Sequence, residues 1–313
     1  NQLRTQGREA YSTIRVRHYG YDLSEEKMEA KHIRTTTLLK EMLEINPEDS
    51  YSRHQLAASY SMHREYDKAA EQGEMALDIM RRKGLWNEFY MTTFYTVAQG
   101  YYALANPEAA ERIGLEALDF FPMHLDICHM LAAIYFKRQA LDQCKDISQR
   151  YFDIYDELAK NPALFGSFYC QSLTKRHEVF FGLACVHFFE KDFEKADEFF
   201  RKSFDDSGRR MEKAKSICRF YLEQQMDQKA LQWLTRAYEE GLHKGDPLPG
   251  TLPSVEDMGP LAYEVAEAFC HRRQWHLAEQ ALNLAFQIAP AIFDHNKFDR
   301  LLLSVEQIPP QSS

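Results

Sequence analysis

The stretch LAASYSMHREYDKAAEQGEMA, residues 56–76, decides how this chain folds. Ala57 and Tyr60 place a small and an aromatic side chain on one face of a first helix, and a polar turn follows them. Ala69 and Gly73 then give a second helix a stripe of small residues, which lets the two helices approach closely. Because small residues face large ones, the stretch predicts a pair of antiparallel helices.

The same spacing of large, small and aromatic residues returns five more times along the chain, once in a weaker form. Self-similarity at fixed offsets is typical of repeat proteins, in which each helix pair buries its apolar face against the next pair. The copies begin at Val97 and Ala98, at Leu131 and Ala132 (the weaker copy), at Leu183 and Ala184, at Ile217 and Cys218, and at Val265 and Ala266.

This pattern resembles the tetratricopeptide repeat (TPR), and the resemblance covers about residues 50–290. It implies an all-α fold, namely a right-handed TPR-like α-solenoid of about six helix pairs. A solenoid also needs a helix at each end that covers its last apolar face. A helical pattern that starts at Ser24 and stops at Asn46 and Pro47 suits one cap, and the apolar face of residues 298–305 suits the other.

These features predict the organisation of the whole chain. Between the helix caps we expect two runs of three repeats, because long insertions interrupt the regular spacing. The expected segments are a remnant of a preceding domain or linker at 1–23, a capping helix within 24–49, repeats one to three at 50–173, repeats four to six at 174–290 with a long loop at 243–259, and a capping helix with a tail at 291–313.

The stretch TIRVRHYGYD, residues 13–22, differs from the rest because its apolar residues alternate with arginines. This period of two predicts a short strand, and a single strand cannot pair its own backbone groups. No other stretch of the sequence pairs with it convincingly, so we expect its sheet to belong to a preceding domain that the chain lacks.

Residues 13–47 resemble the junction at which a bacterial family 2 glycosyltransferase domain runs into TPR repeats. The resemblance implies a catalytic domain upstream, which holds its nucleotide-sugar through a metal bound by an Asp-x-Asp pair. This sequence contains no Asp-x-Asp pair, so we expect no sugar transfer by the chain itself. The residues that carry the resemblance are Ile14, Val16, His18, Tyr19, Gly20, Tyr21, Lys31, Arg34, Leu38, Leu39, Asn46 and Pro47.

The composition excludes several classes of partner. The formal net charge is −9, whereas nucleic-acid binding needs a concentrated positive face, so we expect no nucleic-acid partner. The 6 cysteines form no Cys-x-x-Cys pair, which indicates buried thiols in a reducing, cytoplasmic compartment. The longest apolar stretch, residues 179–189, is too short for a membrane segment, which needs about 18 residues.

Signatures of catalysis and of cofactor binding are missing from the sequence. His124, Cys128 and His129 are the best metal candidates, but only two of them can share one helix face. We therefore expect no catalytic residues, no cofactor and no metal. The chain itself should not be an enzyme, although a parent protein with a family 2 glycosyltransferase domain would be.

A repeat array works through its concave groove, which the first helix of each pair lines. Residues two before, two after and five after each leading large residue should face this groove. Lys215 and Arg219 could hold one carboxylate there, but the asparagines of a carboxylate clamp are missing, and Phe181 and Phe188 are better explained by packing. The predicted groove-binding residues are His54, Tyr95, Gln99, Tyr102, His129, Phe136, Lys215 and Arg219.

The leading functional hypothesis is a protein-interaction scaffold that forms the acceptor- or partner-docking region of a modular glycosyltransferase. Its partner would be a protein or peptide, with a glycosylation acceptor among the candidates. The alternative is a free-standing cytosolic TPR adaptor or assembly factor that binds a peptide in its concave groove. The sequence does not indicate an oligomeric state.

Overall fold

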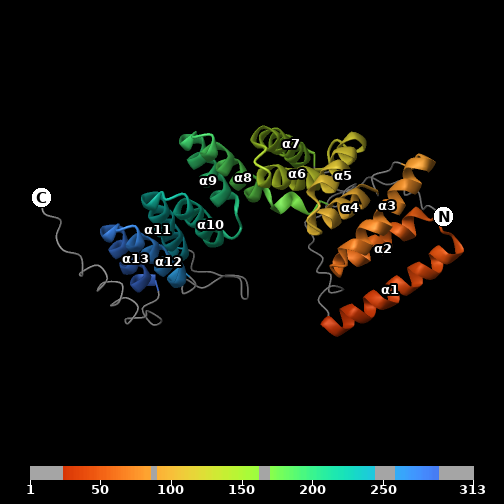
Figure 1. Ribbon diagram of the computed structural model, residues 1–313, viewed down its shortest axis with the longest axis horizontal. Coiled ribbons are helices and arrows are strands. Elements are labelled where there is room, and N and C mark those ends of the chain that lie inside the picture. Colours follow the sequence, from red (N-terminus) through yellow and green to blue (C-terminus); the bar gives the residue numbers. More distant parts are fainter. Residues whose placement is uncertain (1–23, 86–89, 162–169, 244–257, 289–313) are drawn as a thin grey trace, which may run out of the picture. The chain divides into compact units, whose positions relative to one another are not determined.

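The computed structural model describes residues 24–85, 90–161, 170–243 and 258–288. These residues form α-helices joined by short turns, and no strand occurs among them, so the predicted all-α fold is confirmed (Figure 1). The predicted strand-like stretch at 13–22 and the predicted cap at 291–313 lie outside the described residues. Residues 244–257, which make up most of the expected loop at 243–259, also lie outside the described residues. Helix α11 ends at His243 and α12 begins at Met258.

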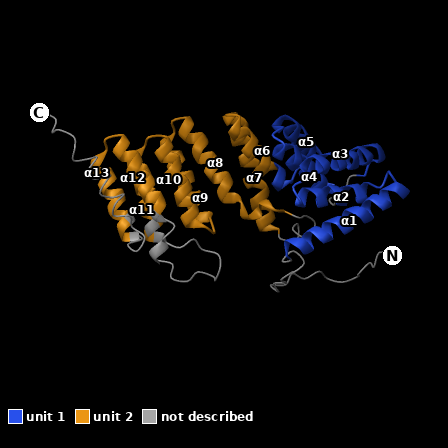
Figure 2. Cartoon of the chain, turned by 60° about the horizontal axis from the view of Figure 1, so that its bottom comes forward, with its two compact units in different colours: residues 1–127, 166–169 blue, residues 128–165, 170–313 orange. Residues whose placement is uncertain are grey.

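The chain divides into two compact units (Figure 2). Unit 1 comprises residues 1–127 with 166–169, and unit 2 comprises residues 128–165 with 170–313. The helices of unit 1 are α1 (Glu25–Ile45), α2 (Ser50–Met62), α3 (Tyr66–Lys83), α4 (Met91–Ala103) and α5 (Pro107–Phe120). Helix α6 (Leu125–Lys137) lies mostly in unit 2, followed by α7 (Leu141–Lys160), the short 3-10 helix η4 (Ser172–Thr174), α8 (Arg176–Phe189), α9 (Phe193–Asp206), α10 (Arg210–Glu223), α11 (Asp227–His243), α12 (Met258–His271) and α13 (Trp275–Ile288).

The helices follow one another as pairs in which an even-numbered first helix precedes an odd-numbered second helix. The same turn joins the helices of each pair from α2 and α3 to α12 and α13. In each turn a residue other than glycine adopts a left-handed conformation, and the next backbone N–H donates to a carbonyl five residues earlier. The left-handed residues are Arg64, Ala105, Gln139, Lys191, Gln225 and Arg273, each eight positions after the leading large residue of its repeat.

Small residues set the close contact between helices of unit 1. A side chain at Gly73 on α3 would place its Cβ only 2.3 Å from Cγ2 of Val97 on α4. Gly100 on α4 similarly faces the backbone oxygen of Tyr66, 3.1 Å from the position of an added Cβ. The predicted small stripe is therefore needed for α3 to pack between α2 and α4.

Helix α1 packs against α2 of the first repeat, within the segment 24–49 for which the sequence predicts an N-terminal cap. It ends at Ile45, and the backbone N–H of Asn46 donates to the carbonyl of Met42. Leu39 is buried against Leu56 and Tyr60 of α2. Ser24 precedes the helix as expected, but its side chain makes no capping hydrogen bond.

The helices of unit 2 enclose a large apolar core. Its fully buried rings include Phe200 and Phe204 on α9, Tyr221 on α10 and Phe269 on α12. Within the described parts of the chain, no helix combines the length and the apolar character that crossing a membrane requires.

Candidate functional site

We use the term first-helix surface for the side chains that the even-numbered helices of a unit leave exposed or half-buried. In unit 1 this surface belongs to α2 and α4. His54 on α2 was predicted to bind a ligand there, but it is buried, with 5% of its surface exposed. Its Nδ1 atom lies 2.9 Å from the hydroxyl of Thr93 on α4, so the imidazole joins two first helices. Burial lowers the pKa of His54 to about 4, which keeps the ring neutral at physiological pH.

The other predicted residues of unit 1 are half-buried on α4. Gln99 accepts a long hydrogen bond of 3.4 Å from Ser61 on α2, which is a second polar link between the same helices. The ring of Tyr95 lies 6.4 Å from that of His124, whose Nε2 donates to the carbonyl of Met91. Tyr102 is half-buried near the end of α4. The structure thus places Tyr95, Gln99 and Tyr102 on one helix, while His54 lies below the surface.

His124 is unsuited to metal binding because it is buried and already uses its Nε2 atom. Cys128 is buried as well, and burial raises the pKa of its thiol to about 12, which disfavours the thiolate that a metal needs. Across the described ranges, no three His, Cys, Asp or Glu side chains gather as a metal site.

In unit 2 the polar residues that the sequence predicts to bind a ligand, His129, Lys215 and Arg219, already have partners. His129 on α6 contacts Glu178 on α8 at 3.0 Å, and Arg219 on α10 contacts Glu264 on α12 at 3.4 Å. Lys215 is almost fully buried and reaches Glu212 at 3.0 Å. A ligand carboxylate would have to displace these partners, which argues against a clamp made by Lys215 and Arg219.

The phenylalanines of this surface mainly pack against their neighbours. The ring of Phe181 lies 5.5 Å from that of Phe200, and the ring of Phe188 lies 5.0 Å from that of Phe220 in the next pair. Phe136 is half-buried against the same core. Their inner edges therefore stabilise the stack, while their remaining surface stays accessible.

Lys213, which the sequence pattern missed, is the cation of this surface without an acceptor. Its ammonium lies 5.1 Å from the ring centre of Phe181, and no hydrogen-bond acceptor or ion-pair partner for it occurs among the described residues. Burial lowers the pKa of Lys213, and the nearby Glu178 carboxylate offsets only part of this effect. Burial also raises the pKa of the Cys185 thiol, so that group supplies no anion at neutral pH.

The direction of helical side chains explains why the pattern missed this lysine. Lys213 lies four positions before Ile217, in the first turn of α10, outside the offsets expected to face the groove. Long side chains on a helix point toward its N-terminus, and the flexible lysine stem can then reach a neighbouring element. Lys213 could have been predicted from the sequence as a cation in the first turn of one first helix, α10, that follows a first helix with an aromatic groove residue, Phe181 on α8.

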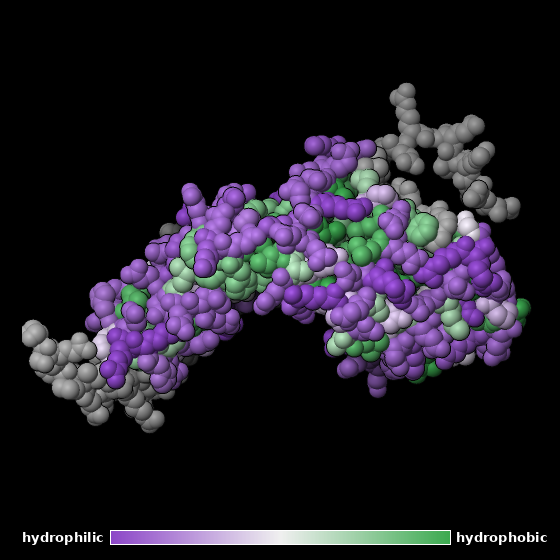
Figure 3. All heavy atoms as spheres, turned by 45° about the horizontal axis from the view of Figure 1, so that its top comes forward, coloured by the Kyte–Doolittle hydropathy of each residue, from purple (hydrophilic) through white to green (hydrophobic). Residues whose placement is uncertain are grey.

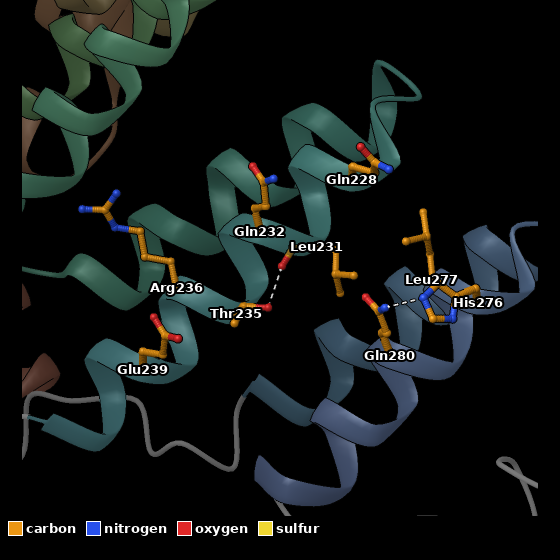
Figure 4. Close-up of a pocket in the computed structure, with 9 residues that line it drawn as sticks. All are labelled: Gln228, Leu231, Gln232, Thr235, Arg236, Glu239, His276, Leu277 and Gln280. Carbon is orange, nitrogen blue, oxygen red and sulfur yellow. Dashed lines mark hydrogen bonds between the residues drawn. The ribbon is translucent and has the colours of Figure 1, made fainter.

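A hollow of about 900 Å³ lies between the second helices α11 and α13 of unit 2 (Figure 4). Figure 4 shows His276 and Gln280 of α13 opposite Leu231 and Thr235 of α11. Most of its lining is polar. The complete lining is Gln228, Leu231, Gln232, Thr235, Arg236, Glu239, His276, Leu277 and Gln280.

Comparisons with known proteins identify the fold. No protein-family model matches the chain, and no curated protein matches it. Among solved structures, the C-terminal part of a TPR repeat-containing protein from Cytophaga hutchinsonii aligns with a TM-score of 0.56 at 12% identity, covering 88% of this chain and 98% of that one. At this identity the likeness shows the fold alone, which is that of a TPR solenoid.

Two further structures resemble the chain more weakly. YrrB, described as a TPR protein with an unusual peptide-binding site, aligns with a TM-score of 0.44 at 15% identity, covering 57% of this chain and 80% of that one. PilF of Pseudomonas aeruginosa aligns with a TM-score of 0.45 at 15% identity, covering 80% of this chain and 96% of that one.

Proposed function

We propose that this chain is a protein-interaction scaffold that binds a peptide on the first-helix surface of unit 2. The observation that carries the proposal is the ammonium of Lys213, held beside the Phe181 ring without an acceptor among the described residues. A half-buried charge of this kind is costly unless a partner satisfies it, and a ligand anion would do so.

The surroundings of Lys213 suggest the chemistry of the ligand. A carboxylate would accept a charge-assisted hydrogen bond from the ammonium, and an adjacent aromatic or aliphatic side chain would contact the Phe181 ring. Figure 3 shows that polar and apolar side chains are mixed on one face of the molecule. The expected ligand is therefore a peptide with an acidic residue next to an apolar one.

Selection from a random peptide library would test this proposal. We expect the wild-type chain to enrich dodecapeptides with Asp or Glu beside an apolar residue, and Lys213→Ala to lose that enrichment. Lys202→Ala on α9 is the matched control, because this lysine pairs with Glu198. If Lys213→Ala selected the same peptides as the wild type, the proposed site would be wrong.

The finer part of the proposal is that this scaffold is the acceptor- or partner-docking region of a modular family 2 glycosyltransferase. It is supported by the resemblance of residues 13–47 to the junction between such a domain and TPR repeats. Docking would act through effective concentration, so even weak peptide binding could direct a tethered active site to its acceptor.

The coding sequence upstream of Asn1 tests this part separately. We expect an α/β domain with an Asp-x-Asp pair to precede the repeats. A gene with no transferase sequence there would contradict it and leave a free-standing adaptor, while the peptide selection would still decide whether Lys213 binds ligand.

A further inference from the structure

Two hollows adjoin on the second helices of unit 2. The larger one lies between α11 and α13, and a smaller one of about 90 Å³ is lined by residues of α9 and α11. Gln232 and Arg236 line both hollows, so the two hollows meet along α11, and together they are called the α11 groove below. No residue of this groove belongs to the first-helix surface.

The smaller hollow has an excess of positive charge. Arg201, Lys229 and Arg236 line it together with a single carboxylate, that of Asp197. Asp197 accepts hydrogen bonds from Lys229 and from the Tyr221 hydroxyl, so the charge of Lys229 is already neutralised. The two guanidinium groups are left as the cations available to a ligand.

The guanidinium group of Arg236 is held in place by aromatic rings. It lies 4.8 Å from the ring centre of Phe204 and 5.2 Å from that of Trp233, and its ion pair with Asp205 is long at 3.9 Å. Stacking fixes the plane of a guanidinium group and leaves its N–H edge free to donate. Arg201 is exposed, and it has neither a hydrogen bond nor an ion pair among the described residues.

A row of polar side chains leads along α11 to this basic end. Gln228, Gln232 and Arg236 are spaced four residues apart, which is about 6 Å along a helix. Two residues of an extended peptide span about 6.6 Å, so every second residue of such a peptide could meet one member of the row. The carboxamides of Gln228 and Gln232 each offer a donor and an acceptor, and no hydrogen bond to either occurs within the described ranges.

We propose that this groove binds an extended phosphopeptide, with its phosphoryl group between Arg201 and Arg236 and its backbone along Gln228 and Gln232. A phosphoryl group carries about −1.5 to −2 charges and three acceptor oxygens, enough for two guanidinium groups. A carboxylate has only two oxygens and one charge. The site is independent of Lys213 and of the function proposed for the first-helix surface.

The test compares three forms of one fluorescent peptide of alternating alanine and threonine, with phosphoserine, glutamate or serine at its centre. Fluorescence anisotropy with the full chain should give the tightest binding for the phosphoserine form, and this affinity should fall as the salt concentration rises. Equal affinity of the three forms, or of the phosphoserine and glutamate forms, would overturn the proposal.

Variants of the two arginines assign the binding to this groove. Arg201→Gln and Arg236→Gln should each lower the affinity for the phosphoserine peptide about tenfold, as expected for the loss of a hydrogen-bonded charge. Arg209→Gln is the control, because this exposed arginine precedes α10 and does not line the groove. Arg236→Lys keeps a charge over the Trp233 and Phe204 rings, so this variant should fold like the wild type, but it should bind the peptide more weakly because lysine lacks the guanidinium fork. Unchanged binding by Arg201→Gln and Arg236→Lys would place the peptide elsewhere and contradict the assignment.

Discussion

The first-helix surfaces of the two units use equivalent repeat positions in different ways. In unit 1 His54 is buried and bonded to α4, so a polar residue at a groove position stabilises the stack. In unit 2 the equivalent positions carry Phe181 and Lys215, which pack or pair, while Lys213 keeps its ammonium beside them without an acceptor among the described residues. A repeat position therefore indicates where a residue lies, whereas its neighbours decide whether it is available to a ligand.

Acidification should weaken unit 1 through His54, and this is the largest effect that we expect. The folded pKa of about 4 lies below the ordinary value of 6.5, so the unfolded chain binds more protons between these two pH values. Stability from this group is therefore lost as the pH falls from 6.5 to 4, by about 3 kcal/mol at the lower limit. Hydrogen exchange of the amides of α2 and α4 would measure it.

His54→Asn isolates this contribution from the titration of carboxylates. Asparagine can still reach Thr93 but does not titrate, so the variant should lose less protection than the wild type below pH 6.5. His276→Asn, at an exposed histidine of α13, should follow the wild type. If His54→Asn and the wild type lost protection in parallel, the histidine would not be the cause.

Adding a methyl group at Gly73 should show how tightly unit 1 is packed. Because the new Cβ would lie 2.3 Å from Cγ2 of Val97, Gly73→Ala should destabilise unit 1 by about 2 kcal/mol. Urea unfolding followed by circular dichroism would measure the change.

Gly182→Ala is the matched control in unit 2. No atom lies within 4 Å of the Cβ that it would add, and alanine favours a helix interior over glycine by up to about 1 kcal/mol. This variant should therefore be stabilised. Similar destabilisation by both substitutions would contradict the explanation that the close contact with Val97 is what destabilises Gly73→Ala.

Replacing Lys213 by methionine should stabilise unit 2 while removing its proposed ligand site. The substitution keeps the apolar contact with Phe181 and removes a half-buried charge, for a gain of about 1 kcal/mol. The pKa of Lys213 is lowered on folding, so the unfolded chain binds more protons above the folded pKa. The wild type should therefore become more stable as the pH rises towards 10.5, and the gain from methionine should shrink.

Lys202→Met is the control, since this lysine is exposed and paired with Glu198. It should change stability little and leave the alkaline pH profile as it is in the wild type. A Lys213→Met variant less stable than the wild type would show that the ammonium contributes to the fold, and would argue against its being held for a ligand.

The sequence predicts the helix pairs because their packing depends on size and spacing that recur along the chain. Every repeat has an aromatic residue or histidine at the position of Tyr60 and an alanine or cysteine at the position of Ala69, which lie in one buried cluster in the first repeat. The candidate site follows no such rule, because several of its polar groups have their partners on another helix. His54 is hydrogen-bonded to Thr93 and Arg219 pairs with Glu264, whereas Lys213 has no acceptor among the described residues. These differences depend on how the helices stack, which the sequence of a single repeat does not specify.

The left-handed turns inside the helix pairs could not be predicted from the sequence, because none of them contains glycine at the left-handed position. They lead to the smallest change in stability that we expect. Ala105 has a φ of 56°, a left-handed conformation that costs about 1 kcal/mol for any residue with a Cβ. Ala105→Gly should therefore stabilise unit 1 by about 0.5 kcal/mol, the remainder being offset by the greater freedom of glycine in the unfolded chain. Ala103→Gly, at the end of α4, should have the opposite sign because that residue is helical. If both glycines lowered the urea midpoint alike, the turn at Ala105 would not be left-handed in solution, and the feature shared by all six described turns would need another explanation.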